Sequence, residues 1–194
     1  MSTIPRISAR REPSWLSWRR FRLRAAPPRR LSPWLRDTGS LTARLKTCCG
    51  AQGFRVEVLG QRWGRPLPGE ARLLGMRAGE RALVREVRLT CGARGAWVFA
   101  RTLIPAASLR GSALRLTHLG ERPLGQLLFS DPNAHRGTTA MARLLPIHPL
   151  YQAALAGRAM RPGVLWGRRT LFRFRGYPLL VTEIFLPELP DFPR

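Results

Sequence analysis

Apolar and polar residues alternate along several short stretches of the chain, and this pattern is typical of half-buried β-strands. Residues 54–59 alternate in this way, whereas residues 60–69 are rich in Gly and Pro and predict a loop. Four more stretches show strand patterns and predict two hairpins, with turns at Gly92–Gly95 and at Gly176: residues 82–90 with 97–104, and residues 170–175 with 179–186.

Helical signals are fewer. Residues 34–46 have apolar positions compatible with a helix, and Ser40 is a candidate N-cap within them. Residues 123–129 and 138–158 lie between the hairpins, and the second of these has a helical composition interrupted by prolines. Sequential hairpins with a few helices predict an α+β fold built on a single antiparallel β-sheet.

Length and composition fit a folded domain. The chain has 194 residues, of which 44% are hydrophobic, so it can bury a substantial core. We expect a loose basic tail over residues 1–13 and a single domain over residues 14–194. No apolar run is long enough for a transmembrane segment, and the basic N-terminus lacks the apolar region of a secretory signal, although an Arg-rich transit peptide is an alternative.

The charge is strongly positive, with 34 Lys and Arg against 11 Asp and Glu, a formal net charge of +23. Such a balance suggests nucleic acid or an anionic membrane surface as a partner. However, Lys46 is the only lysine, and near-total use of arginine is more typical of a compositional bias of the source genome. We therefore expect no specific nucleic-acid partner.

The cysteines are Cys48, Cys49 and Cys91. Two are adjacent, the number is odd, and no C-x-x-C spacing occurs. This pattern argues against a disulfide framework and against a zinc site, and it favours a reducing, cytoplasmic location.

Each of three predicted strands carries one charged residue on its apolar side, namely Arg85, Arg101 and Glu183. The positions that alternate with Arg85, such as Glu86 and Arg88, are expected to face water. Three charged side chains from one sheet are thus predicted to point inward.

Burying an unpaired charge costs several kcal/mol, so such groups persist only with partners. One interpretation is an internal Arg–Glu bridge, or edge strands that are wet on both faces. The other is a pocket for a small anion, because the guanidinium fork matches a carboxylate. Two arginines and one glutamate leave an excess of positive charge, which a ligand with several carboxylates would balance.

Several blocks of sequence resemble the bacterial chorismate lyases. The blocks occur in the family's order and together span residues 34–187: Ser40-Leu41-Thr42, residues 84–87, residues 100–105, residues 119–120 with 123–129, residues 165–170 (LWGRRT) and residues 178–187 (PLLVTEIFLP). No single block is decisive, but their combination is highly specific. The resemblance implies conversion of chorismate to 4-hydroxybenzoate and pyruvate, the step that supplies the ubiquinone ring.

The resemblance also implies roles for individual residues. Arg85 would bind the ring carboxylate and Glu183 the ring oxygen at the opposite end, and both would be catalytic. Leu41 and Leu124 would contribute pocket wall and main-chain contacts, although both also fit as plain core leucines. Arg101 would be a second cation near the enolpyruvyl carboxylate. Leu41 stands where the family has Met, a volume-conserving exchange that should be tolerated.

The implied fold places helical lid segments over a buried ligand pocket, and the lid should differ here because residues 133–163 form a longer segment than in the shortest relatives. The implied reaction makes an aromatic ring, so it needs no metal and no cofactor, and no metal-binding or nucleotide-binding motif occurs. We expect a monomer whose partner is the small molecule chorismate.

Two rival functions belong to other classes. Effector domains of some transcription regulators resemble this fold, so a non-enzymatic ligand-sensing module is an alternative; residues 1–36 are too few for a winged-helix DNA-binding domain. A basic nucleic-acid-binding protein is the other, but no basic stripe interleaved with aromatic residues is evident.

Overall fold

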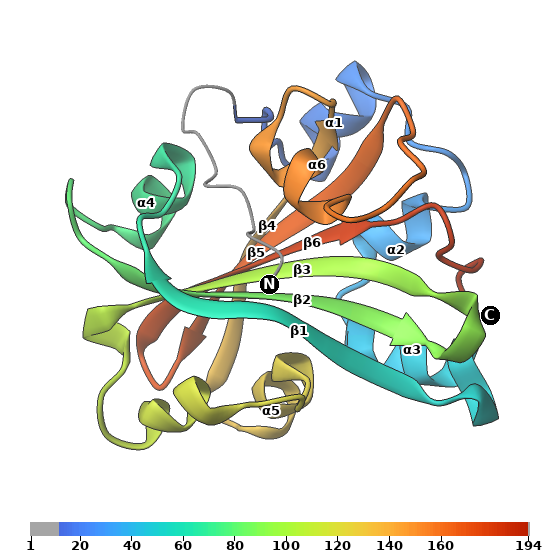
Figure 1. The fold of residues 1–194 in the computed structure, drawn as a ribbon. Coiled ribbons are helices and arrows are strands. Elements are labelled where there is room, and N and C mark those ends of the chain that lie inside the picture. The colour runs from blue at the N-terminus through green and yellow to red at the C-terminus, as the bar shows by residue number, and fades with distance from the viewer. Residues whose placement is uncertain (1–11, 194) are drawn as a thin grey trace.

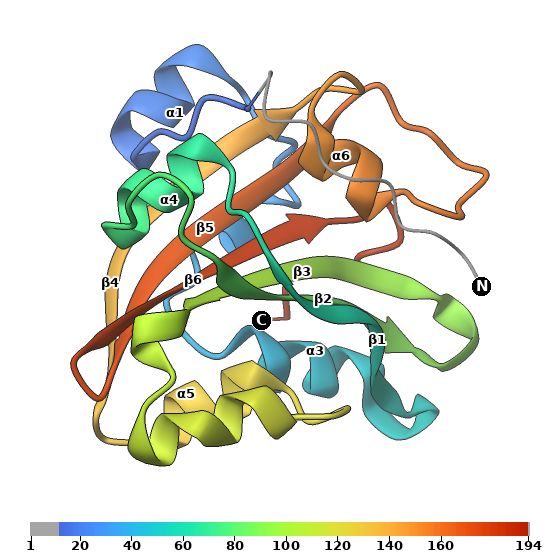
Figure 2. The ribbon, with the colours of Figure 1, turned by 60° about the vertical axis from the view of Figure 1, so that its left-hand side comes forward.

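Six antiparallel strands form one sheet in the order β1-β2-β3-β6-β5-β4 (Figures 1 and 2). The computed structural model describes residues 12–193. The strands are β1 Phe54–Gly64, β2 Ala82–Cys91, β3 Ala96–Pro105, β4 Ala134–Leu144, β5 Leu165–Phe174 and β6 Tyr177–Phe185. The predicted α+β class with a single antiparallel sheet is confirmed.

Both predicted hairpins are present. Strands β2 and β3 are joined through a short 3-10 turn, Gly92–Arg94, and β5 and β6 through Arg175 and Gly176, which have φ angles of 53° and 84°. Strand β1 is longer than predicted, because it continues through an irregularity between Val58 and Gly60. The prediction of a loop over residues 60–69 is therefore wrong in its first half.

Six short helices connect and cover the strands: α1 Trp18–Arg24, α2 Ser32–Arg36, α3 Leu41–Cys49, α4 Pro68–Leu74, α5 Leu124–Ser130 and α6 Pro149–Ala154. The helix predicted over residues 34–46 is two helices, separated by residues 37–40. Ser40 is the N-cap of the second one, and its side chain accepts a hydrogen bond from the Ala43 N–H at 3.3 Å. The break between the two helices becomes important at the candidate site.

The helical prediction for residues 138–158 is wrong for most of the segment. Its first part belongs to β4, which pairs with β5 with Ala142 opposite Gly167, and only Pro149–Ala154 is helical. Helix propensity is a weak preference, and backbone pairing with the open edge of β5 overrides it. The first part of this segment therefore extends the sheet as part of β4.

Helices cover the two faces of the sheet separately (Figures 1 and 2). Helices α3 and α5 lie on one face, and α4 and α6 on the other. The second face buries Phe99 and Ile184 against α6, and the first buries Val87 and Leu89 in a core shared with α3. The central strands β2 and β3 are buried along almost their whole length, so their polar residues must find partners within the protein, whereas the edge strands β1 and β4 expose several residues.

Cys49 and Cys91 form a disulfide, with their Cα atoms 5.7 Å apart, and Cys48 is free. The argument against disulfide bonding from odd number and spacing is thus wrong. The two residues are 42 positions apart in sequence, and only the packing of the end of α3 against the end of β2 brings them together. The bond ties helix α3 to the strand that carries Arg85.

The N-terminal segment is packed from residue 12 onward. The Glu12 carboxylate accepts a hydrogen bond from the Gly69 N–H at 2.7 Å, and Leu16 exchanges backbone hydrogen bonds with Met141. The predicted loose tail otherwise falls on residues 1–11, outside the described residues, so the domain boundary stays a prediction. Within residues 12–193, no helix is long and apolar enough to cross a membrane.

Arg101 is buried on the face opposite to Arg85. The register pairs Arg85 with Thr102 and Glu86 with Arg101, so neighbours in one strand pair point to opposite sides. The Arg101 guanidinium contacts Glu70 of α4 through Nε at 3.0 Å and Glu86 through Nη1 at 2.7 Å. The prediction that Glu86 faces water is therefore wrong. Arg101 forms an internal Arg–Glu ion pair, which was one of the two interpretations of the inward-pointing charges.

This bridge predicts a stability effect. Arg101→Met should lower the free energy of unfolding by about 3–5 kcal/mol, because it leaves buried Glu70 without a cation and buried Glu86 with Arg62 alone. Arg62→Met is the matched control, since Arg62 contacts Glu86 at 3.2 Å from a partly exposed position and its loss should cost less than about 1 kcal/mol. Urea unfolding of the two variants measures the difference, and equal losses would contradict the assignment.

Candidate active site

A cavity lies between the sheet and helices α3 and α5. Four of the five predicted site residues line it: Leu41, Arg85, Leu124 and Glu183. Arg101 does not, because it points to the opposite face of the sheet and contacts Glu70 and Glu86 there. The expectation that Arg101 lies in the substrate site is therefore wrong. In the register of β2 and β3, Arg101 pairs with Glu86 and so lies on the face opposite to Arg85.

Small side chains form the floor of the cavity. Ala100 and Thr102 of β3 line it, and their neighbours across the sheet are Val87 and Glu183 for Ala100, and Arg85 and Val181 for Thr102. The strands that carry Arg85 and Glu183 are thus two strand spacings apart, about 10 Å. The cation and the carboxylate stand at opposite sides of a floor that leaves room for a ring between them.

The Arg85 guanidinium is buried and held by neutral acceptors. Its Nη2 donates to the Gly120 carbonyl oxygen at 2.8 Å, and Nη1 donates to the Gln61 side-chain oxygen at 3.4 Å. Burial lowers the pKa of Arg85, and no carboxylate forms an ion pair with it among residues 12–193. A cation in such a place is stabilised by an anionic ligand.

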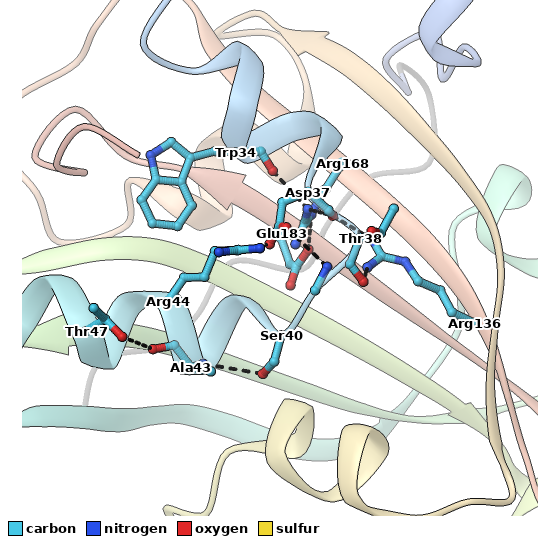
Figure 3. Close-up of polar contacts among 11 residues, drawn as sticks. Trp34, Asp37, Thr38, Ser40, Ala43, Arg44, Thr47, Arg136, Arg168 and Glu183 are labelled. Atoms are coloured by element: carbon cyan, nitrogen blue, oxygen red, sulfur yellow. Dashed lines mark hydrogen bonds and ion pairs between the residues drawn. The ribbon is translucent and has the colours of Figure 1, made fainter. Parts of the chain in front are cut away.

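Glu183 is fixed from the neighbouring strand by Arg168. The Nε of Arg168 donates to Oε2 of Glu183 at 2.5 Å, and its Nη1 donates to the carbonyl oxygens of Trp34 at 2.8 Å and Asp37 at 2.6 Å (Figure 3). Arg168 is almost wholly buried, so these bonds are not weakened by water. One carboxylate oxygen of Glu183, Oε1, is left for a ligand.

Residues 37–40, between α2 and α3, contribute Gly39 to the cavity lining and are held by three arginines (Figure 3). Besides Arg168, Arg136 donates to the carbonyl oxygens of Thr38 at 2.6 Å and Asp37 at 3.2 Å. Arg44 donates from Nε to the Asp37 carboxylate at 2.7 Å. This segment, here called the 37–40 strap, sets where α3 and its Leu41 side chain begin.

Leu41 and Leu124 each lie at the first position of a short helix and contribute apolar wall. The two helices approach closely, because a Cβ at Gly125 would stand 2.9 Å from Oγ1 of Thr42. Glycine at residue 125 therefore lets α5 pack directly on α3. The wall of the cavity is made by two helix N-termini that are in contact.

The cavity carries more positive than negative charge. Arg85, Arg136, Arg168 and Glu183 line it, which gives a local excess of two positive charges. Within the described residues, no group of three His, Cys, Asp or Glu side chains gathers that could hold a metal ion. The lining suits a mainly apolar ligand that carries two carboxylates.

Sequence reasoning missed Arg136 and Arg168 as cavity residues. Arg168 lies in the LWGRRT block that resembles the family. On β5 it pairs with Met141 on one side and with Glu183 on the other, so its side chain lies on the same face of the sheet as Glu183. Alternation along β5 could therefore have placed Arg168 on the cavity face. Arg136 had no such signal, because it lies between residues 123–129 and 138–158, in a stretch for which the sequence predicted no helix or strand.

The family is shown by the sequence. The model of the family described as chorismate lyase matches residues 13–192. This chain belongs to the chorismate lyase family. A protein of Azoarcus sp. (strain BH72) named "Probable chorismate pyruvate-lyase" is 49% identical over 180 residues, covering 87% of this chain and 94% of that protein. One of Methylococcus capsulatus with the same name is 45% identical over 166 residues, covering 84% and 99%.

Solved structures with a similar fold come from transcription regulators. PhnF from Mycobacterium smegmatis matches with a TM-score of 0.58 at 19% identity, covering 81% of this chain and 68% of that one. The ligand-binding domain of a GntR-family regulator from Bordetella bronchiseptica matches with a TM-score of 0.51 at 17% identity, covering 75% and 91%. At these identities the likeness concerns the fold alone, which this chorismate lyase family member shares with effector domains.

The strap predicts a pH effect on stability. Burial opposes ionisation of Asp37, but hydrogen bonds from Arg44 and the Gly39 N–H, together with the charges of Arg44 and Arg168, hold its pKa below the ordinary value. A carboxyl whose pKa is lower in the folded state stabilises the fold above its unfolded pKa, and this contribution disappears as the pH falls through the folded pKa.

Asp37→Asn should therefore be less stable than the wild type at neutral pH, and the difference should shrink as the pH falls below about 4. Thermal unfolding at a series of pH values measures it. A stability difference that stays constant from neutral to acid pH would show that the Asp37 charge does not contribute.

Proposed function

We propose that this chain is a chorismate pyruvate-lyase that converts chorismate to 4-hydroxybenzoate and pyruvate, the step that supplies the ubiquinone ring. Membership in the family supports the reaction. The observation that carries the assignment to this cavity is the pair Arg85 and Glu183, which stand at opposite sides of a floor of small residues.

In the proposed complex the ring lies over Ala100 and Thr102. The ring carboxylate pairs with Arg85, and the ring hydroxyl, which is para to that carboxylate, donates to Oε1 of Glu183. Leu41 and Leu124 pack on the apolar ring face. Helices α3 and α5 are then the helical lid segments of the predicted fold, and the cavity beneath them is the ligand pocket.

The reaction depends more on how the substrate is positioned than on a reactive group of the protein. Chorismate is a cyclohexadiene, and loss of the enolpyruvyl ether together with one ring hydrogen makes the ring aromatic. In a concerted path the ring hydrogen moves to the enolpyruvyl methylene, the ring carbon–oxygen bond breaks, and the oxygen becomes the ketone of pyruvate. The protein then has to fold the side chain over the ring and exclude water.

Glu183 is better placed to orient than to act as a base. Its Oε2 accepts the Arg168 Nε–H inside a buried ion pair, so protonation of this carboxylate would leave the Arg168 charge without its counter-ion. We therefore assign Glu183 to hold the ring hydroxyl, which fixes the neighbouring carbon–hydrogen bond relative to the ether.

The activity is tested by incubating the protein with chorismate and measuring both products, which should appear in equimolar amounts without added metal. Arg85→Ala should lower kcat/KM by about two decades, from the loss of a charge-assisted pair of about 1.5–3 kcal/mol. Arg85→Lys should recover only part, because a point charge cannot reproduce the fork. Near-wild-type kinetics of Arg85→Ala would show that the ring carboxylate binds elsewhere.

The same assay separates the rival ligand-sensing function, which the shared fold with effector domains favours. A sensor would bind chorismate or 4-hydroxybenzoate in this cavity and release no pyruvate.

Isotope transfer distinguishes the two roles of Glu183. Chorismate deuterated at the carbinol carbon should give pyruvate that keeps deuterium in its methyl group, when lactate dehydrogenase and its reduced cofactor trap the pyruvate as lactate. Complete loss of the label to water would instead indicate a base. Glu183→Gln removes the counter-ion of Arg168 as well as the carboxylate, so the fate of the deuterium, and not the rate of this variant, decides between the two roles.

A further inference from the structure

Chorismate carries a second carboxylate on its enolpyruvyl group. Arg101, which was expected to bind this carboxylate, does not line the cavity. Arg101 lies on the opposite face of the sheet and is engaged by Glu70 and Glu86. If the proposed function holds, another group in the cavity must face that carboxylate, because an unpaired carboxylate in a closed pocket is costly.

Two of the three arginines that line the cavity are already committed. Arg85 stands at the end assigned to the ring carboxylate. Arg168 is paired with Glu183 and donates two more bonds to the carbonyl oxygens of Trp34 and Asp37. Its charge is compensated and three of its donors are used, so it serves to position Glu183.

Arg136 is different. It comes from β4, is half-buried, and lines the cavity. Within residues 12–193, no carboxylate forms an ion pair with it, and its hydrogen bonds go to the carbonyl oxygens of Asp37 and Thr38. A guanidinium has five N–H donors, so donors remain for a ligand while the strap stays bound.

The location of Arg136 also fits. Arg136 and Arg168 both donate to the Asp37 carbonyl oxygen, and Arg168 also donates to Glu183, so Arg136 stands at the Glu183 end of the cavity (Figure 3). In the proposed complex the ring hydroxyl is at this end, and the ether that carries the enolpyruvyl group is on the adjacent ring carbon. Burial lowers the pKa of Arg136, with the charge of Arg168 acting in the same direction, and an added anion relieves both effects.

We propose that Arg136 binds the enolpyruvyl carboxylate of chorismate and thereby holds the leaving group folded over the ring. Arg136 is then a substrate-binding residue that distinguishes the dianionic substrate from the monoanionic product. After the reaction only pyruvate carries the carboxylate that Arg136 bound, while 4-hydroxybenzoate remains on Arg85 and Glu183.

The test compares two ligands that differ in this one carboxylate. Arg136→Met should lower kcat/KM for chorismate by about tenfold to a hundredfold, mainly through KM, since one charge-assisted pair is lost. The Kd for 4-hydroxybenzoate, measured by calorimetry, should stay within about twofold of the wild type, because the product has no group for Arg136 to bind. Arg136→Lys, which keeps the charge and is the milder change for folding, should be intermediate for chorismate and unchanged for 4-hydroxybenzoate.

Arg44→Met is the matched control. The Nε of Arg44 contacts Oδ2 of Asp37 in the same strap at 2.7 Å, but Arg44 does not line the cavity. Its loss therefore reproduces any destabilisation of the strap without removing a ligand contact. It should affect chorismate and 4-hydroxybenzoate equally and slightly.

Three results decide the question. A parallel loss for chorismate turnover and 4-hydroxybenzoate binding in Arg136→Met and Arg136→Lys would overturn the proposal and leave Arg136 a strap residue. Unchanged kinetics in Arg136→Met would overturn it too. A wild type that binds 4-hydroxybenzoate without turning over chorismate would instead refute the proposed function, and this is measured before any variant is compared.

Discussion

The buried ion pair between Arg168 and Glu183 is the interaction on which the cavity depends. One guanidinium on β5 fixes the carboxylate on β6 and, through the carbonyl oxygens of Trp34 and Asp37, the connection between α2 and α3. The floor and the wall of the cavity are thus joined at a single side chain. Removing one partner of such a pair leaves an uncompensated buried charge, which is far more costly than losing a surface bridge.

The two faces of the sheet use buried arginines for opposite purposes. On the face covered by α4, Arg101 lies between Glu70 and Glu86, and its charge is fully met by protein groups. On the face covered by α3 and α5, three guanidiniums share one glutamate. A cluster whose charges balance holds elements together, whereas a cluster with surplus charge and free volume is completed by a ligand.

Alternation along a single strand predicted that Arg85 and Glu183 point inward, and it could do so because each strand has a strict period of two. The same rule failed for Arg101, since the parity of one strand says nothing about the next until the register is known, and here odd positions of β2 pair with even positions of β3. The alternation rule also failed for Glu86, because it was applied on the assumption that one face of the sheet is exposed to water. Arg136 and the Cys49–Cys91 bond depend on tertiary packing, for which the local pattern carries no signal.

The cavity contains few groups that could react with a substrate. The sheet that forms its floor and the two helices that cover it provide orientation and exclusion of water. For a substrate whose product is aromatic, these two effects address the part of the barrier that remains, namely bringing the departing side chain over the ring. On this view the reaction requires a second cation at the Glu183 end of the ring more than it requires a nucleophile or a base. The proposed cation, Arg136, fits this requirement, because β4 is the strand next to the Arg168–Glu183 pair on the side away from Arg85.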